Sequence, residues 1–123
     1  MEKAVLLVED DESIRELYQS ALTAAGINTL TAPDGSQGVA LALLHKPVVI
    51  LMDITLPVMD GHEAVRKIRE DDWGKTAKII YLTNHSEPEH VVNAFAEKPE
   101  EYIIKANADI KEVVNAVRTA MHQ

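Results

Sequence analysis

Residues 48–61 read Val48-Val49-Ile50-Leu51-Met52-Asp53-Ile54-Thr55-Leu56-Pro57-Val58-Met59-Asp60-Gly61, and this stretch decides the fold class. The apolar run at its start is short, begins with β-branched residues and lies between two prolines. This pattern predicts a strand over residues 48–53 that is buried on both faces, as in parallel α/β sheets. Asp53 closes the strand at the place where open α/β sheets carry their sites. A carboxylate there either caps the next turn or belongs to a functional site.

Outward from this stretch, strand-like and helix-like segments alternate along the chain. We predict strands at 4–8, 27–31, 48–53, 78–83 and 101–104, and helices with apolar stripes at about 14–25, 39–44, 61–70, 87–95 and 110–121. The second strand is the most polar, so we expect it at an edge of the sheet. The alternation implies parallel pairing through right-handed crossovers, with the doubly wound order 2-1-3-4-5. The sequence therefore predicts one α/β domain, residues 1–123, built on a five-stranded parallel sheet.

The composition is that of an ordinary soluble domain, since 46 % of the 123 residues are hydrophobic and 26 % are charged. A formal net charge of −8, with no run of Lys and Arg, argues against binding to nucleic acid or to an anionic membrane. The absence of cysteine excludes disulfides and thiolate metal sites. The first apolar run is too short for a signal peptide or a membrane span, so we expect a soluble, cytoplasmic protein.

Polar residues gather where the predicted strands end. The first strand runs into Glu9-Asp10-Asp11-Glu12, the third ends at Asp53, the fourth at Thr83 and the fifth at Lys105. In a 2-1-3-4-5 sheet these four strands are contiguous, and their carboxyl ends meet at one edge. We therefore expect two or three carboxylates, a hydroxyl and an ammonium to share one crevice.

Each of these groups has a role in phosphoryl transfer. Clustered carboxylates repel one another unless a hard divalent cation neutralises them, and oxygen-only ligands suit Mg²⁺. A hydroxyl and an ammonium supply hydrogen bonds and positive charge to phosphoryl oxygens, while a carboxylate can be the nucleophile. Taken singly, residues 9–12 read as a solvated helix start, Thr83 as strand-end packing and Lys105 as a surface lysine. Their joint occurrence favours a phosphoryl-transfer site.

Four segments resemble the receiver domain of two-component response regulators, which has the CheY-like, flavodoxin-like fold. They are Leu6–Asp11, Leu51–Gly61 with its Asp-x-x-Leu-Pro-x-Met-Asp-Gly pattern, Ile80–Thr83 and Tyr102–Lys105. The resemblance implies that Asp53 is the phosphoacceptor, supplied by a histidine kinase or a histidine phosphotransfer protein. It also implies that Asp10 is the direct carboxylate ligand of Mg²⁺, that Glu9 acts largely through bound water and that Thr55 lends its backbone carbonyl.

The same resemblance implies a switch. Thr83 would bond a phosphoryl oxygen and report phosphorylation to the surface, and Lys105 would pair with the phosphoryl group. Tyr102 stands where the family keeps its rotating aromatic residue, and Asp11 is expected to cap a helix rather than bind metal. A stand-alone switch of this kind signals by contact with an output protein or passes the phosphoryl group on. No turnover of an external substrate is expected.

Two positions depart from the family's pattern. Proline usually follows the lysine, in a cis peptide, but here Ala106 does; because a non-proline cis bond costs about 3 kcal/mol, we expect a trans link and a somewhat different loop. A small residue usually follows the threonine, whereas Asn84 stands here and would narrow access to Asp53. His85, two positions past Thr83, would orient or exclude the hydrolytic water, or would be a surface histidine.

Other residues carry weaker expectations. The remaining histidines, at 45, 62, 90 and 122, are scattered in the sequence and predict no ligand set. Trp73 is expected to cover the core from a loop. In the fourth helix, Val91, Val92 and Phe95 are expected to face the core.

Rival interpretations remain open. A degenerate receiver would keep the fold and act as a constitutive binding module, an idea supported only by Asn84 and Ala106. The residues could also form the receiver of a longer regulator or hybrid kinase. A flavin-binding electron carrier needs a phosphate-cradling loop after the first strand, where this chain is acidic. An aspartyl phosphohydrolase needs a second acid two residues after Asp53, where Thr55 stands.

Overall fold

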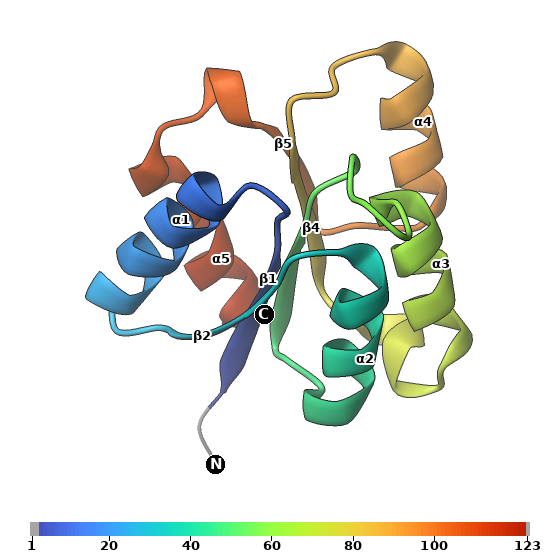
Figure 1. Cartoon of the computed structure of the whole chain (residues 1–123), viewed down its shortest axis with the longest axis horizontal. Helices are drawn as coiled ribbons and strands as arrows, with labels where there is room; N and C mark the ends of the chain where they lie inside the picture. The colour runs from blue at the N-terminus through green and yellow to red at the C-terminus, as the bar shows by residue number, and fades with distance from the viewer. Residues whose placement is uncertain (1–2, 123) are drawn as a thin grey trace.

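The computed structural model describes residues 3–122 and shows a five-stranded parallel sheet with helices on both faces (Figure 1). Its elements, in chain order, are β1 (Ala4–Val8), α1 (Glu12–Ala24), β2 (Asn28–Ala32), α2 (Gly35–His45), β3 (Val49–Met52), α3 (Gly61–Glu70), η1 (Trp73–Thr76), β4 (Ile79–Thr83), α4 (Pro88–Ala96), β5 (Glu101–Ile104), η2 (Lys105–Asn107) and α5 (Ile110–Met121). The strands lie in the order β2-β1-β3-β4-β5. The predicted doubly wound topology is therefore confirmed, including the edge position of β2.

The sheet carries a separate hydrophobic core on each face, because successive side chains of a strand point to opposite sides. Leu6 of β1 and Ile50 of β3 pack with residues of α2, α3 and α4. Val5 and Leu51, from the same two strands, pack with residues of α1 and α5 on the other face. Figure 1 shows these two helices together on that side of the sheet. All four residues of β3 are buried, which explains its unbroken apolar run.

Aspartate caps fix where four of the five α-helices begin. Asp11, Asp34, Asp60 and Asp109 each accept a hydrogen bond from a backbone N–H of the first turn of α1, α2, α3 and α5, respectively. The capping role expected of Asp11 is confirmed, with Ile14 N donating to its Oδ1 at 3.0 Å. These caps set the directions in which the loops leave the carboxyl edge of the sheet.

The orientation predicted for α4 is wrong. Val92 and Phe95 are 67 % and 59 % exposed, whereas Ala94 is fully buried and Val91 is half-buried. The helix meets the sheet through a small residue, and its larger apolar residues point to solvent. By contrast, Trp73 packs against the core from η1, as expected. No helix within residues 3–122 is both long enough and apolar enough to cross a membrane.

Candidate functional site

The carboxyl ends of the strands surround a cavity of about 290 Å³. It is lined by Glu9, Asp10, Asp11, Ile14, Asp53, Thr55, Asn84, His85 and Lys105. Five of the seven residues predicted for the site are among them, and Thr83 and Tyr102 are not. The neighbouring strands β1 and β3 are paired from Val5 and Val49 to Val8 and Met52, which places the residues that follow Val8 and Met52 side by side. The convergence expected from the 2-1-3-4-5 order is therefore present.

Lys105 is an ion-pair partner of two acidic residues in this cavity. Its Nζ donates to Asp53 Oδ2 at 2.9 Å and to Glu9 Oε1. All three side chains are at least nine-tenths buried, so their charges meet where water screens them little. A buried ion pair of this kind matters for specificity and electrostatics as much as for stability.

The charge states of the pair follow from burial and contact. Burial raises the pKa of the Glu9 carboxyl above its ordinary value, and the hydrogen bond from Lys105 opposes this rise. For Lys105, burial alone would lower the pKa of the ammonium, but the hydrogen bonds to Glu9 and Asp53 outweigh it and raise the pKa. The lysine therefore stays protonated at neutral pH and supplies a permanent positive charge beside Asp53.

The backbone after β3 holds Asp53 in place. Asp53 N donates to the carbonyl oxygen of Val8 at 3.2 Å, and Ile54 N donates to Asp53 Oδ1 at 2.7 Å. Gly61 N closes the loop by donating to the Ile54 carbonyl at 2.7 Å. A β-carbon on Gly61 would lie 2.0 Å from the Asp53 carbonyl oxygen, so only glycine lets α3 start this close to the strand end.

Three carboxylates form a candidate cation site. One oxygen from each of Glu9, Asp10 and Asp53 can be chosen so that all lie within 4.8 Å of one another. Among residues 3–122, the Asp10 carboxylate has no hydrogen-bond donor or ion-pair partner, although it is exposed at the cavity and lies beside two buried acids. An all-oxygen donor set with this concentration of negative charge fits a hard cation such as Mg²⁺.

Thr83 and Tyr102 reach the cavity only indirectly, through His85. The Thr83 side chain is fully buried, and its Oγ1 accepts a hydrogen bond from His85 N at 3.3 Å. The Tyr102 hydroxyl, on β5, donates to the His85 carbonyl oxygen. His85 itself lines the cavity and pairs with the Thr55 hydroxyl through Nε2. The two residues predicted to form the switch therefore contact the same residue of the β4–α4 loop.

Asn84 and Ala106, the two departures from the family's pattern, bond to each other. Ala106 N donates to Asn84 Oδ1 at 3.1 Å, which ties the loop after β4 to the loop after β5. A proline at position 106 would have no N–H to donate. All peptide bonds between described residues are trans, including the one that joins Lys105 to Ala106, as expected. Asn84 lines the cavity together with Asp53.

Two of the histidines that are scattered in the sequence, His62 and His90, lie together in the structure, next to His85. His85 and His90 lie with ring centroids 4.4 Å apart, and His62 of α3 stacks on His90 at 5.6 Å. Glu87 completes a cluster with His85 and His90. The spacing His-x-Glu-x-x-His across the start of α4 already indicates that His85, Glu87 and His90 can meet. The contact of His62 with this cluster depends on how α3 packs against α4.

The fold and this site define the class of protein. Residues 5–118 match the family model described as the response regulator receiver domain, and the chain belongs to this family. Receiver domains serve two-component signalling, and members of the family typically bind Mg²⁺ and accept a phosphoryl group.

Individual relatives are similar over most of the chain. The polar-differentiation response regulator DivK of Brucella anthropi is 35 % identical over 83 residues, which are 68 % of each chain. The transcriptional regulatory protein AfsQ1 of Streptomyces coelicolor is 34 % identical over 83 % of this chain and 44 % of its own length. The receiver domain of the Pseudomonas aeruginosa sensor histidine kinase PA1611, described with magnesium coordinated in its active-site cleft, superposes with a TM-score of 0.90 at 28 % identity, covering 100 % of both chains. The chain spans about half the length of several curated relatives.

Proposed function

We propose that this receiver accepts a phosphoryl group on Asp53 from the phosphohistidine of a histidine kinase or a histidine phosphotransfer protein. The observation that carries the proposal is the position of Lys105 Nζ, 2.9 Å from Asp53 Oδ2, in the cavity that Glu9 and Asp10 also line. In the transfer, an Asp53 carboxylate oxygen forms a bond to phosphorus while the bond from phosphorus to the donor imidazole nitrogen breaks. The products are an acyl phosphate on Asp53 and an unphosphorylated histidine.

The surrounding groups would stabilise the added charge. The Lys105 ammonium would pair with a phosphoryl oxygen, and the Thr83 hydroxyl would donate a hydrogen bond to another. Asp10, Asp53 and the backbone carbonyl of Thr55 would hold Mg²⁺, with Glu9 acting through bound water. The bound ion would supply further positive charge to the phosphoryl oxygens.

The contacts of His85 suggest how phosphorylation would reach the surface. When Thr83 turns toward a phosphoryl oxygen, its Oγ1 gives up the hydrogen bond from His85 N. The loop that carries His85 is then freer to move, together with the Tyr102 hydroxyl bound to the His85 carbonyl. The surface formed by α4, β5 and α5 would change, and the exposed Val92 and Phe95 on α4 are suited to contact a partner. A shift from mostly inactive to mostly active needs a few kcal/mol of differential stabilisation.

In this proposal the phosphorylated protein signals by contacting another protein or by passing the phosphoryl group on in a relay. Both events would take place in the cytoplasm. DivK, a response regulator of which this chain covers 68 %, supports a stand-alone role. The alternative, a receiver belonging to a longer regulator or hybrid kinase, is favoured by the relatives of which the chain spans about half.

Intact-mass spectrometry tests the proposal directly. The protein is incubated with Mg²⁺ and a small acyl-phosphate donor, and we expect the mass to increase by one phosphoryl group. Asp53→Asn should not be modified, whereas Asp60→Asn, which alters an exposed acid at the start of α3, should be modified like the native chain. Equal modification of the native chain and Asp53→Asn would contradict the choice of acceptor. No modification of the native chain, together with no Mg²⁺ binding by titration calorimetry, would favour the constitutive binding module.

A further inference from the structure

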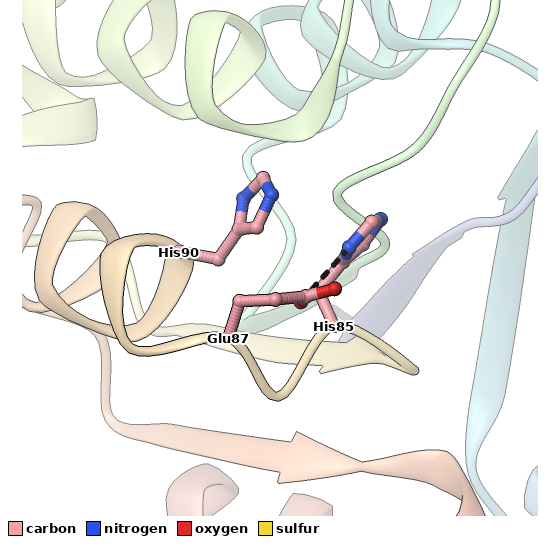
Figure 2. A group of neighbouring side chains, drawn as sticks. All are labelled: His85, Glu87 and His90. Carbon is pink, nitrogen blue, oxygen red and sulfur yellow. Dashed lines mark hydrogen bonds and ion pairs between the residues drawn. The ribbon is translucent and has the colours of Figure 1, made fainter.

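A second group of ligand-type side chains lies at the start of α4. His85 comes from the loop after β4, Glu87 is the N-cap residue of α4 and His90 lies in its first turn. Figure 2 shows the three side chains gathered around one space, with the carboxylate of Glu87 turned toward the His85 ring. His85 Nδ1 is 3.3 Å from Glu87 Oε2, and one ligand atom from each residue can be chosen so that all three lie within 4.8 Å of one another.

Contacts on the far side of each ring select the nitrogen that faces this space. His85 uses Nε2 for the Thr55 hydroxyl, which leaves Nδ1 for a ligand. His90 Nδ1 lies 3.4 Å from His62 Nε2, which leaves its own Nε2. Histidine ligands of metals usually donate their second ring N–H to such a partner, because that contact fixes the tautomer and the ring orientation. Both rings therefore already have the outer contact that a metal ligand needs.

The Glu87 carboxylate and the His62 ring add two independent observations. Glu87 is the N-cap residue of α4, but its side chain makes no capping hydrogen bond to the first turn and is turned toward His85 instead. His62 is 8 % exposed, and its Nδ1 has no hydrogen-bond partner among residues 3–122. His62 Nε2 lies 3.4 Å from His90 Nδ1, so His62 occupies the outer side of the His90 ring.

We propose that His85 Nδ1, Glu87 and His90 Nε2 form a binding site for a divalent transition metal ion, with Zn²⁺ the best match. Two imidazoles and one carboxylate are a typical three-ligand set for zinc and leave a fourth position for water. Imidazole suits Zn²⁺, Cu²⁺ and Ni²⁺, whereas Mg²⁺ prefers oxygen, so this site would differ in selectivity from the carboxylate cluster around Asp53. Zinc bonds of roughly 2.0–2.2 Å require the three atoms to approach one another, which the exposed Glu87 side chain permits.

Metal binding would also fix the β4–α4 loop. The His85 backbone contacts both Thr83 Oγ1 and the Tyr102 hydroxyl, so an ion bound to its ring would hold these residues in the arrangement described above. The chemistry of the site does not depend on phosphorylation of Asp53, and it can be measured without a phosphodonor.

Isothermal titration of the full chain with Zn²⁺ in Mg²⁺-free buffer tests the site, with Co²⁺ as a spectroscopic probe of coordination by nitrogen. We expect one Zn²⁺ per chain, and at least about tenfold weaker binding in His85→Ala, His90→Ala and Glu87→Gln. His45→Ala, which alters an exposed histidine at the end of α2, is the matched control and should bind like the native chain. Asp10→Ala, which alters the carboxylate cluster, should also keep its affinity.

Two results would overturn the site. The first is Zn²⁺ binding weaker than millimolar in the native chain. The second is binding that survives both histidine substitutions or is lost in Asp10→Ala, because the ion would then sit among the carboxylates. Circular dichroism of the metal-free variants checks that each is folded. If a histidine variant unfolds, Glu87→Gln still tests the site, because it alters an exposed position. Failure of the zinc site leaves the Asp53 mass experiment unaffected.

Discussion

Lys105 carries a buried positive charge between two buried carboxylates, and its removal leaves both of them unpaired. We expect Lys105→Met to lower the free energy of unfolding at pH 7 by roughly 3 kcal/mol, the size typical of breaking a buried ion pair. The measurement is urea denaturation without Mg²⁺. Lys75→Met is the matched control, because Lys75 pairs with Asp72 on the surface and its loss should change stability by less than about 1 kcal/mol. If both substitutions lowered the free energy of unfolding equally, the claim that burial makes the Lys105 ion pairs important for stability would be wrong.

The side-chain oxygen of Asn84 accepts a hydrogen bond from Ala106 N, and substitutions at position 84 can remove or keep this acceptor. In Asn84→Ala the backbone N–H of Ala106 loses its hydrogen-bond acceptor, and we expect the hydrogen exchange of this N–H to accelerate. Asn84→Asp keeps an oxygen in the same place and should keep the slow exchange. The measurement is amide exchange followed by NMR. Fast exchange at Ala106 in the native chain would show that the two loops are not joined in solution.

At the scale of elements, the contact between α3 and α4 includes a buried histidine with a pH-dependent contribution to stability. Burial lowers the pKa of His62 below its ordinary 6.5, so below that pH the unfolded chain binds a proton more readily than the folded chain. Stability is therefore retained above pH 6.5 and lost as the pH falls toward the folded-state pKa. In EDTA-containing buffer, His62→Phe should flatten the dependence of unfolding free energy on pH between 7 and about 5. His122→Phe, at an exposed position, should keep the native slope.

Elements also show what sequence patterns can and cannot predict. Strand positions and order were predictable because β3 is buried on both faces and its apolar run is unbroken. The orientation of α4 was not, because Val91, Val92 and Phe95 suggest an inward stripe while the fully buried residue is Ala94. Helix α2 follows the same rule: Gly38 and Ala42 face the sheet, and Leu44 is 74 % exposed. Small residues that permit close packing give little hydrophobic signal.

For the molecule as a whole, a net charge of −8 and three clustered carboxylates make cation binding a stabilising event. We expect Mg²⁺ to raise the melting temperature more than NaCl does at equal ionic strength. The free energy of unfolding should rise by about 2.7 kcal/mol when Mg²⁺ reaches a hundred times its dissociation constant. Calorimetric melting curves measure this. Asp10→Ala should lose most of the gain, and Asp72→Ala, at a fully exposed side chain, should lose none. If Mg²⁺ stabilised both variants equally, screening of the protein's negative charge by salt would explain the whole effect, and no specific Mg²⁺ site would be needed.

At this scale the acidic site was predictable, whereas the contact between His62 and His90 was not. Parallel strand order places the ends of β1, β3, β4 and β5 at one edge, so Asp53, Asp10 and Lys105 could be grouped from the sequence alone. His62 and His90 meet because two helices pack together at a particular rotation, which no local pattern encodes. The same holds for the bond between Asn84 and Ala106, which joins loops 22 positions apart.

The crowding at Gly61 restricts how this sequence can vary over time. The atom that a methyl group would meet, 2.0 Å away, is a backbone oxygen of the phosphoacceptor candidate itself, and a rotamer change cannot move it aside. Every codon change at position 61 that alters the amino acid must therefore displace Asp53. We expect a saturation library selected for a functional switch to recover glycine alone there, while its exposed neighbour Val58 accepts many replacements.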